Sequence, residues 1–142
     1  MRVHSALGLP LAAMLTLCLP AGLSAATDPQ AVEEVRAGKR TVAHASWWGF
    51  EAEESTAALQ AAIDSGAKKV VVEKMPSPWV VDKLRLAGDQ ELFFEAGAEV
   101  LAKKGAFHGT SDSLFSAAGK KDLRLIGPGA TLRMRRADYD GK

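Results

Sequence analysis

Cysteine is almost absent from this sequence. Its one cysteine, Cys18, lies in the apolar segment at the N-terminus. The chain after that segment therefore has no thiol for a disulfide, for a thiolate metal site or for nucleophilic catalysis. A lipoprotein signal needs a small residue before its cysteine, and Leu17 is not small. The sequence thus favours cleavage of this segment over lipid anchoring at Cys18.

An excess of charge of either sign is also lacking. Lys and Arg number 18 and Asp and Glu number 17, which gives a formal net charge of +1. Nucleic-acid-binding domains usually carry a clear basic excess, so we expect no nucleic-acid partner. With 47% hydrophobic and 25% charged residues, the composition is that of an ordinary globular chain and not of a disordered one.

Only one long hydrophobic run is present, at residues 6–19. It is shorter than the roughly 20 apolar residues that a membrane-spanning helix needs. A basic N-terminus precedes it and small residues follow it, which predicts a signal peptide over residues 1–26, cut between Ala26 and Thr27. We therefore expect a secreted or periplasmic protein, free of the membrane after cleavage, with one domain over residues 27–142.

Residues 55–73 join a helical pattern to a strand. Leu59 and Ile63 lie on one apolar face at helical spacing, and Gly66 supplies a helix stop. The three valines at 70–72 are β-branched and show no polar alternation, which predicts a short strand buried on both sides. We expect the helix, over residues 55–65, to cover the start of a sheet.

No second helical pattern follows this strand. Upstream, Asp28, Pro29 and Gly38 have the types expected at the start and stop of another short helix. Downstream, short apolar segments recur between Gly, Pro, Asp and charged turns, too short for a sheet that alternates with helices. These predicted strands are residues 79–81, 84–86, 92–94, 100–101, 114–115, 123–126 and 132–134.

The strands carry a weak repeat. Val72 and Phe94 end two apolar strands 22 positions apart. Residues 93–100 also align with residues 125–132, at a spacing of 32. The longer spacing equals the shorter one with about ten residues inserted, and the polar, Gly-rich residues 105–113 are the predicted insertion. A step near 22 residues with several short strands per turn is typical of a coiled β-solenoid.

These patterns resemble a known group of proteins. The run Ser-Thr-Ala-Ala-Leu-Gln-Ala-Ala-Ile at 55–63, the valine strand and Phe-Glu-x-Gly-Ala at 94–98 are similar to the N-terminal entry of right-handed parallel β-helix proteins of the pectate-lyase-like and polygalacturonase-like kind. Residues 45–50, 113–115 and 129–134 are similar to a bacterial secreted subgroup. The resemblance spans residues 43–139 and implies a capping helix, stacked parallel strands and an outer groove that binds polysaccharide.

The resemblance also implies where catalysis lies. Enzymes of this group use clustered Asp, or Asp-bound calcium with a basic residue, on coils well past the entry coils. We therefore expect no catalytic, cofactor-binding or metal-binding residue in this chain, and the resemblance allows calcium in a full-length parent. The chain departs from the group at one point, because Glu54 stands where Asp usually precedes the helix. Glu is a poorer N-cap, so the helix is expected to begin at Ser55.

Two sets of residues are candidate glycan contacts. Trp47 and Trp48 form either a sugar-stacking platform or aromatic packing beneath the next helix, and packing is the favoured interpretation. Arg85, Arg124 and Arg133 each alternate with apolar residues and should project outward. They form either a basic ladder for an acidic sugar or a solvated face neutralised by nearby Glu residues, and the solvated face is favoured.

Other polar residues are weaker candidates. His44 has no partner nearby in sequence, so we interpret it as structural or solvated. Asp112 lies near His108, but a solvated loop is favoured over an acid and base pair. Asp138 and Asp140 are too few for a calcium site and are interpreted as solvated.

The sequence therefore predicts a mainly β fold: a right-handed parallel β-helix with an N-terminal capping helix, incomplete at its C-terminus. We expect the chain to be the non-catalytic N-terminal part of a secreted carbohydrate-active protein. The full-length parent is expected to be a polysaccharide lyase or a glycoside hydrolase, with polysaccharide as the partner. The alternative is a non-catalytic glycan-binding or structural surface module.

Overall fold

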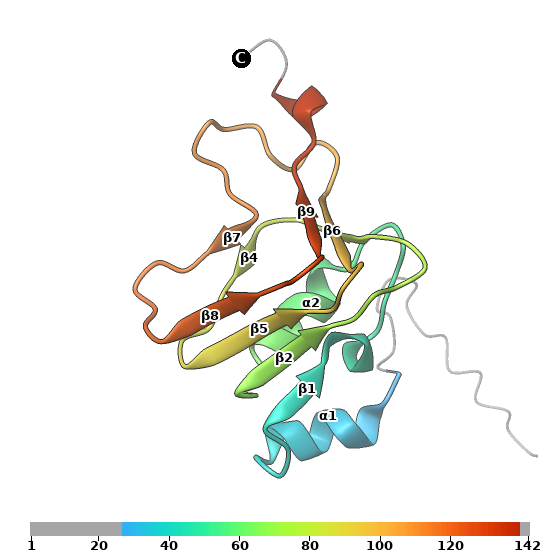
Figure 1. The fold of residues 1–142 in the computed structure, drawn as a ribbon, viewed down its shortest axis with the longest axis vertical. Helices are drawn as coiled ribbons and strands as arrows, with labels where there is room; N and C mark the ends of the chain where they lie inside the picture. Colours follow the sequence, from blue (N-terminus) through green and yellow to red (C-terminus); the bar gives the residue numbers. More distant parts are fainter. Residues whose placement is uncertain (1–26, 140–142) are drawn as a thin grey trace, which may run out of the picture.

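The computed structural model describes residues 27–139 (Figure 1). The predicted signal peptide, residues 1–26, lies outside the described residues, as does Asp140. None of the helices within residues 27–139 is long and apolar enough to cross a membrane. The helices are α1 (Pro29–Arg36), α2 (Thr56–Ile63) and the short 3-10 helices η1 (Ala45–Trp48) and η2 (Arg136–Asp138). The strands are β1 (Val42–His44), β2 (Lys69–Val72), β3 (Trp79–Val81), β4 (Leu84–Arg85), β5 (Gln90–Phe94), β6 (Glu99–Ala102), β7 (Phe115–Ser116), β8 (Leu123–Ile126) and β9 (Thr131–Arg133).

All strand pairs are parallel and form three sheets. Sheet A has the order β1-β2-β5-β8, sheet B the order β3-β6-β9, and sheet C pairs β4 with β7. The chain visits A, B and C in turn, then returns to A one strand further along (Figure 1). This mainly β arrangement is compatible with a parallel β-solenoid. The predicted 22-residue step is confirmed, because Val72 pairs with Phe94.

The later register differs by one residue from the predicted alignment. In sheet A, Phe93 pairs with Ile126, a spacing of 33, and not with Leu125. In sheet B, Val100 pairs with Leu132, the predicted spacing of 32. The corner between the two strands is therefore one residue shorter in the later coil. Gly127 lies in this shorter corner, where an added Cβ would lie 3.3 Å from the Cβ of Phe94.

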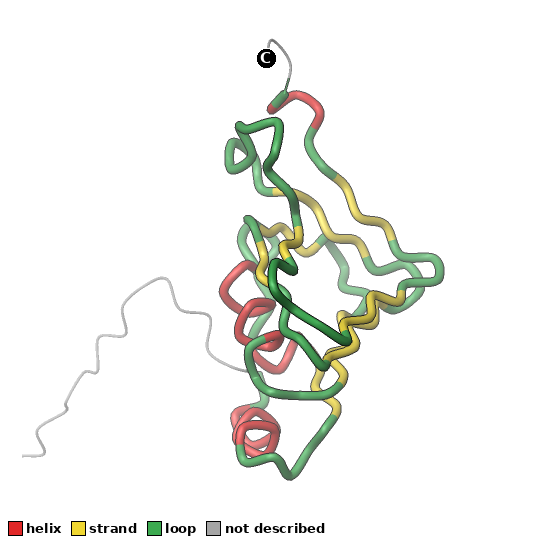
Figure 2. The backbone as a smooth tube through the Cα atoms, turned by 90° about the vertical axis from the view of Figure 1, so that its left-hand side faces the viewer, coloured by secondary structure: helices red, strands yellow, loops and turns green. Residues whose placement is uncertain are grey.

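The predicted insertion is confirmed between β6 and β7. Val81 and Leu84 are three positions apart, whereas the equivalent Ala102 and Phe115 are thirteen apart. The ten extra residues lie within the loop over residues 103–114. Phe107 anchors this loop, because its side chain is fully buried in the core. Figure 2 shows this loop and η2 at the end of the molecule opposite α1.

Both predicted helices are present, with local causes that the sequence indicates. Asp28 caps α1 by accepting the N–H of Ala31 at 2.9 Å. Helix α2 begins at Thr56, one residue later than expected, and its first N–H donates to the Glu54 carboxylate at 2.9 Å. Glu54 thus serves the first turn although it is not the residue next to the helix. Gly66 has a φ of +84°, as a left-handed helix stop requires.

Helix α2 closes the first coil by hydrogen bonding to strand edges. The N–H of Ser55 donates to the Val80 carbonyl at 2.7 Å, and the Thr56 hydroxyl accepts the N–H of Asp82 at 2.8 Å. The Gln60 amide both donates to the carbonyl and accepts the N–H of Arg85, each at 2.9 Å. These groups of α2 and its N-cap therefore pair with backbone that would otherwise form an open edge, as a capping helix must.

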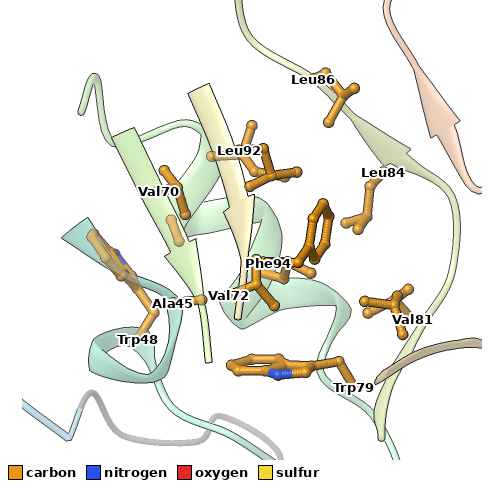
Figure 3. Close-up of a cluster of buried hydrophobic side chains, with 14 of the residues drawn as sticks. Ala45, Trp48, Val70, Val72, Trp79, Val81, Leu84, Leu86, Leu92 and Phe94 are labelled. Carbon is orange, nitrogen blue, oxygen red and sulfur yellow. The ribbon is translucent and has the colours of Figure 1, made fainter. Parts of the chain in front are cut away.

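The core lies between the three sheets and α2. Inward residues of β2, β5, β3 and β4 converge on it, as Figure 3 shows for Val72, Phe94, Val81 and Leu84. Trp79 is fully buried, and its indole N–H donates to the Glu73 carbonyl at 2.9 Å. All three valines of β2 are buried, which confirms the prediction of a strand covered on both sides.

The last coil exposes apolar side chains that the earlier coils bury. Leu125 and Leu132 pair with Leu92 and Val100, which are fully buried or nearly so. Leu125 itself is 45% exposed and Leu132 is 47% exposed. The same register position is thus covered in the middle coil and open in the last one.

This difference predicts unequal effects of one mutation at two ladder partners. Leu92→Ala should lower the free energy of unfolding by about 2–5 kcal/mol, because it leaves a cavity in the core. Leu125→Ala should lower it by less than about 1 kcal/mol, since the side chain is half exposed. Urea denaturation of both variants measures the two losses. An equally large loss for Leu125→Ala would show that the last coil is covered in solution.

The capping role of α2 predicts a second pair of effects. Gln60→Ala removes both hydrogen bonds to the backbone of Arg85 and should cost about 1–2 kcal/mol of unfolding free energy. Gln30→Ala is the matched control, because the Gln30 amide only donates to Glu34 on the exposed face of α1. Its cost should stay below about 0.5 kcal/mol. Equal losses in thermal or urea unfolding would contradict a capping role for Gln60.

Candidate functional site

The outer face of sheet A carries a row of side chains made by the strand register. His44 pairs with Val71, Val71 with Phe93, and Phe93 with Ile126. Their neighbours along β1, β2 and β5 point into the core, so these four lie on the opposite, outer side of the sheet. Val71 is only 8% exposed, whereas His44 and Phe93 are half-buried and Ile126 is exposed. We call them the apolar row. At about 4.8 Å between strands, the row extends about 14 Å across the face.

A charged row runs beside the apolar row. Lys69 pairs in register with Glu91, and Glu91 with Arg124. The Lys69 ammonium lies 3.2 Å from the Glu91 carboxylate and 4.4 Å from the centre of the Phe93 ring. Arg124 is exposed and has no ion pair or hydrogen bond from its side chain within the described residues. The face therefore combines an aromatic ring with one paired and one unpaired cation.

Glu73 organises the end of this face next to β1. Its carboxylate accepts the hydroxyl of Ser46 at 2.5 Å and the N–H of Ser46 at 3.2 Å. Nδ1 of His44 lies 3.4 Å from the same carboxylate. Since Ser46 donates to a carboxylate and not to the imidazole, this set does not form an activated serine nucleophile. The carboxylate instead lies close to both Ser46 and the His44 imidazole.

The two tryptophans have different surroundings. Trp48 is only 7% exposed and belongs to the core (Figure 3). It offers no open ring face to a sugar and packs in the interior, in agreement with the favoured interpretation of aromatic packing. Trp47 is half-buried beside the apolar row. Its ring centre lies 5.0 Å from that of His44 and 5.5 Å from the Arg40 guanidinium. Trp47 therefore continues the aromatic surface of His44, but the two tryptophans form no joint platform.

The three candidate arginines do not lie together. All are exposed, as predicted, but Arg85 lies in sheet C, Arg124 in sheet A and Arg133 in sheet B. A stacked ladder is therefore not formed, because alternation sets which side of a strand faces out but not which sheet the strand joins. Arg133 donates to Glu99 at 3.2 Å, in keeping with a neutralised, solvated face.

The loop over residues 103–114 is held by carboxylates and not solvated throughout. Asp112 accepts the backbone N–H groups of Gly109 and His108, each at 2.9 Å, so it bonds to the backbone of His108 and not to its imidazole. Lys83 lies 3.4 Å from the same carboxylate. Asp138, also expected to be solvated, accepts the N–H of Gly105 at 2.9 Å.

Two carboxylates, Asp112 within this loop and Glu54 beside it, have pKa values shifted from the ordinary ones. The N–H of Gly109, together with that of His108 and the Lys83 ammonium, holds the pKa of Asp112 below its usual value. Partial burial pushes the pKa of Glu54 upward, but hydrogen bonds from Lys103 and Thr56 outweigh burial and keep that pKa below its usual value. The pKa of Lys103 is correspondingly raised by its hydrogen bond to Glu54.

Within residues 27–139, no three or more His, Cys, Asp or Glu side chains cluster in a way that could hold a metal ion. Searches against protein-family models, curated proteins and solved structures find no match to this chain.

Of the candidate glycan contacts, the structure brings Trp47 and Arg124 to the outer face of sheet A. Sequence reasoning missed Phe93 and Lys69, and it gave His44 no partner. Aligning β2 and β5 on the 22-residue step would have placed Lys69 beside Glu91 and Phe93 in line with Val71.

The lowered pKa of Asp112 predicts a pH-dependent loop. The stabilising contribution of this group is present above the ordinary Asp pKa of about 3.9, and it is lost as pH falls through the lower folded-state pKa. The amide NMR signals of His108 and Gly109 should therefore titrate below about pH 3.9. Asp112→Asn should abolish that titration and leave the amides of β5 unchanged. A midpoint above the ordinary value would contradict the hydrogen bonding described here.

Proposed function

We propose that this chain is the N-terminal part of a secreted carbohydrate-active protein with a right-handed parallel β-helix. The outer face of sheet A is its polysaccharide contact surface. Right-handedness is supported by the general rule that parallel strands of one sheet are joined by right-handed crossovers in about 98% of cases. Secretion is supported by the N-terminal pattern of residues 1–26, and carbohydrate as the partner by the resemblance of residues 43–139.

The observation that carries the proposal is the apolar row flanked by cations. Phe93 and the Trp47–His44 pair present ring surface at the same face, and apolar ring surface complements the C–H faces of sugars. Lys69 and Arg124 supply donors for sugar hydroxyl or carboxylate groups beside the rings. Because the row runs across successive coils, a polysaccharide would lie along the solenoid axis and contact one coil after another.

In the full-length parent we propose a polysaccharide lyase or a glycoside hydrolase, whose catalytic residues lie on later coils. The alternative is a non-catalytic glycan-binding or structural surface module. Glu73 and Glu91, two carboxylates at this face, are each engaged by neighbouring side chains and are compatible with both candidates. Incubating the secreted full-length protein with a polysaccharide panel separates the two. Released reducing ends or unsaturated uronates support the enzyme, whereas retention without cleavage supports the module.

The proposed surface predicts which variants lose binding. In affinity electrophoresis, a polysaccharide that binds the protein slows its migration through the gel. Phe93→Ala should weaken binding to such a polysaccharide by about tenfold, a loss of about 1.4 kcal/mol. Arg85→Ala is the control, because Arg85 is exposed but lies on sheet C. Its mobility shift should match that of the unmodified protein. The proposed surface would be contradicted if Phe93→Ala were slowed as much as the unmodified protein by every polymer that binds the latter. It would also be contradicted if no polymer of the panel slowed the unmodified protein.

A further inference from the structure

The last strands of the three sheets form an open end of the molecule. Within residues 27–139, β8, β9 and β7 each pair on one side only, so backbone N–H and C=O groups along their other side form an edge. Of the five large hydrophobic side chains exposed in this part of the chain, four lie in or beside β8 and β9: Leu125, Ile126, Leu132 and Met134. The open end, defined by β7, β8 and β9, therefore combines unpaired backbone with apolar side chains.

The charged row of sheet A alternates in sign as it approaches this end. Lys69 pairs in register with Glu91, and Glu91 with Arg124. The Lys69 ammonium lies 3.2 Å from the Glu91 carboxylate, whereas the Arg124 side chain has no ion pair within residues 27–139. Opposite charges on neighbouring strands stabilise a sheet, and like charges destabilise it. The position after Arg124 in this row therefore favours an acidic residue.

The inward row of the same sheet favours an apolar residue at the next position. Val70 pairs with Leu92, and Leu92 with Leu125. Val70 and Leu92 are fully buried, while Leu125 is 45% exposed, so an apolar side chain over Leu125 would remove its surface from water. Ile126, on the outer side, is also exposed. A parallel strand added to β8 thus needs the order acidic, apolar, apolar, which residues 91–93 of β5 already have.

A second copy of the chain does not fit this end. Two copies joined through it would use the same patch on both sides, so the cations Arg124, Arg133 and Arg135 would face their own counterparts. A head-to-tail copy would need an open edge at the opposite end. There, α2 bonds to the backbone of β3 and β4, and α1 lies beside β1 (Figure 1). The charges therefore favour a different, acidic strand as the occupant.

We propose that the open end binds one further parallel coil, and that the strand added to β8 carries an acidic residue beside Arg124. This inference rests on the proposed function, because the occupant is the next coil of the longer parent. The acidic residue forms the second ion pair of the row, after Lys69 and Glu91, and the apolar residues that follow it cover Leu125 and Ile126. Sheet B makes no such demand, since Arg133 already donates to Glu99 at 3.2 Å.

The test supplies the added strand as a separate peptide to the chain over residues 27–142. The peptide carries Val-Glu-Val-Val between polar ends, and its control has Lys in place of Glu. Backbone amide NMR signals measure binding at about 0.15 M salt, where exposed charges more than about 8 Å apart are largely screened. The Glu peptide should shift the amides of β8. It should bind about two- to fivefold more tightly than the Lys peptide, the range expected of an exposed pair of opposite charges.

Two charge-reversal variants locate the preference. Arg124→Glu should bind the Lys peptide more tightly than the Glu peptide. Arg133→Glu is the matched control, because Arg133 is also exposed on the last coil but is already paired with Glu99, and it should keep the preference for Glu. Equal affinities of the two peptides for the unmodified chain, or an unchanged preference in Arg124→Glu, would overturn the acidic position.

Other outcomes would overturn the open end as a binding site for a strand. These are binding of neither peptide, amide shifts that spare β8, and self-association of the chain through β8 without peptide. Each of these results leaves the polysaccharide surface standing, because that surface is tested separately by the Phe93→Ala and Arg85→Ala variants. Failure of that second test would in turn leave the preference of Arg124 for an acidic strand unchanged.

Discussion

The fold depends on satisfying the backbone groups at the edge of each coil. Each coil of parallel strands pairs only with the coils next to it. The first coil of the chain therefore leaves N–H and C=O groups of β3 and β4 open on one side. Helix α2 meets this need with Ser55, Thr56 and Gln60. The same helix buries Leu59 and Ile63 against the core. One short segment thus supplies both the polar and the apolar closure of the coil.

The stacking of coils also creates the candidate site. No two neighbours in the apolar row are close in sequence, yet Val71 and Phe93 become adjacent because β2 and β5 pair with a 22-residue offset. The core-facing valines and leucines fix that offset, since a slip of one residue would bury the charged row and expose the core. The surface chemistry of sheet A is therefore set by the packing of its opposite face. For this reason the 22-residue spacing of the buried residues Val72 and Phe94 also predicts which outward residues lie side by side.

Much of the fold could be predicted from the sequence, because its signals are local. Asp28 and Pro29 indicate α1, Gly66 ends α2, and the valines of β2 indicate a buried strand. The one-residue change of register near Gly127 was missed, since it depends on a corner whose length no local propensity records. The sequence could not show that the three candidate arginines lie in three different sheets for a related reason. Alternation predicts which side of a strand a residue faces, whereas the turns determine which sheet the strand joins. His44 was left without a partner because Glu73 approaches it only after β1 and β2 pair.

The central claim is that the outer face of sheet A binds polysaccharide along the coils. The most direct measurement is the change in backbone amide NMR signals of the secreted protein as oligosaccharides from the polysaccharide panel are added. The account predicts that the largest changes lie on His44, Val71, Phe93 and Ile126 and on Lys69 and Arg124 beside them, with sheets B and C unaffected. Changes concentrated on the loop over residues 103–114 or on sheet B, or no change at all, would contradict it.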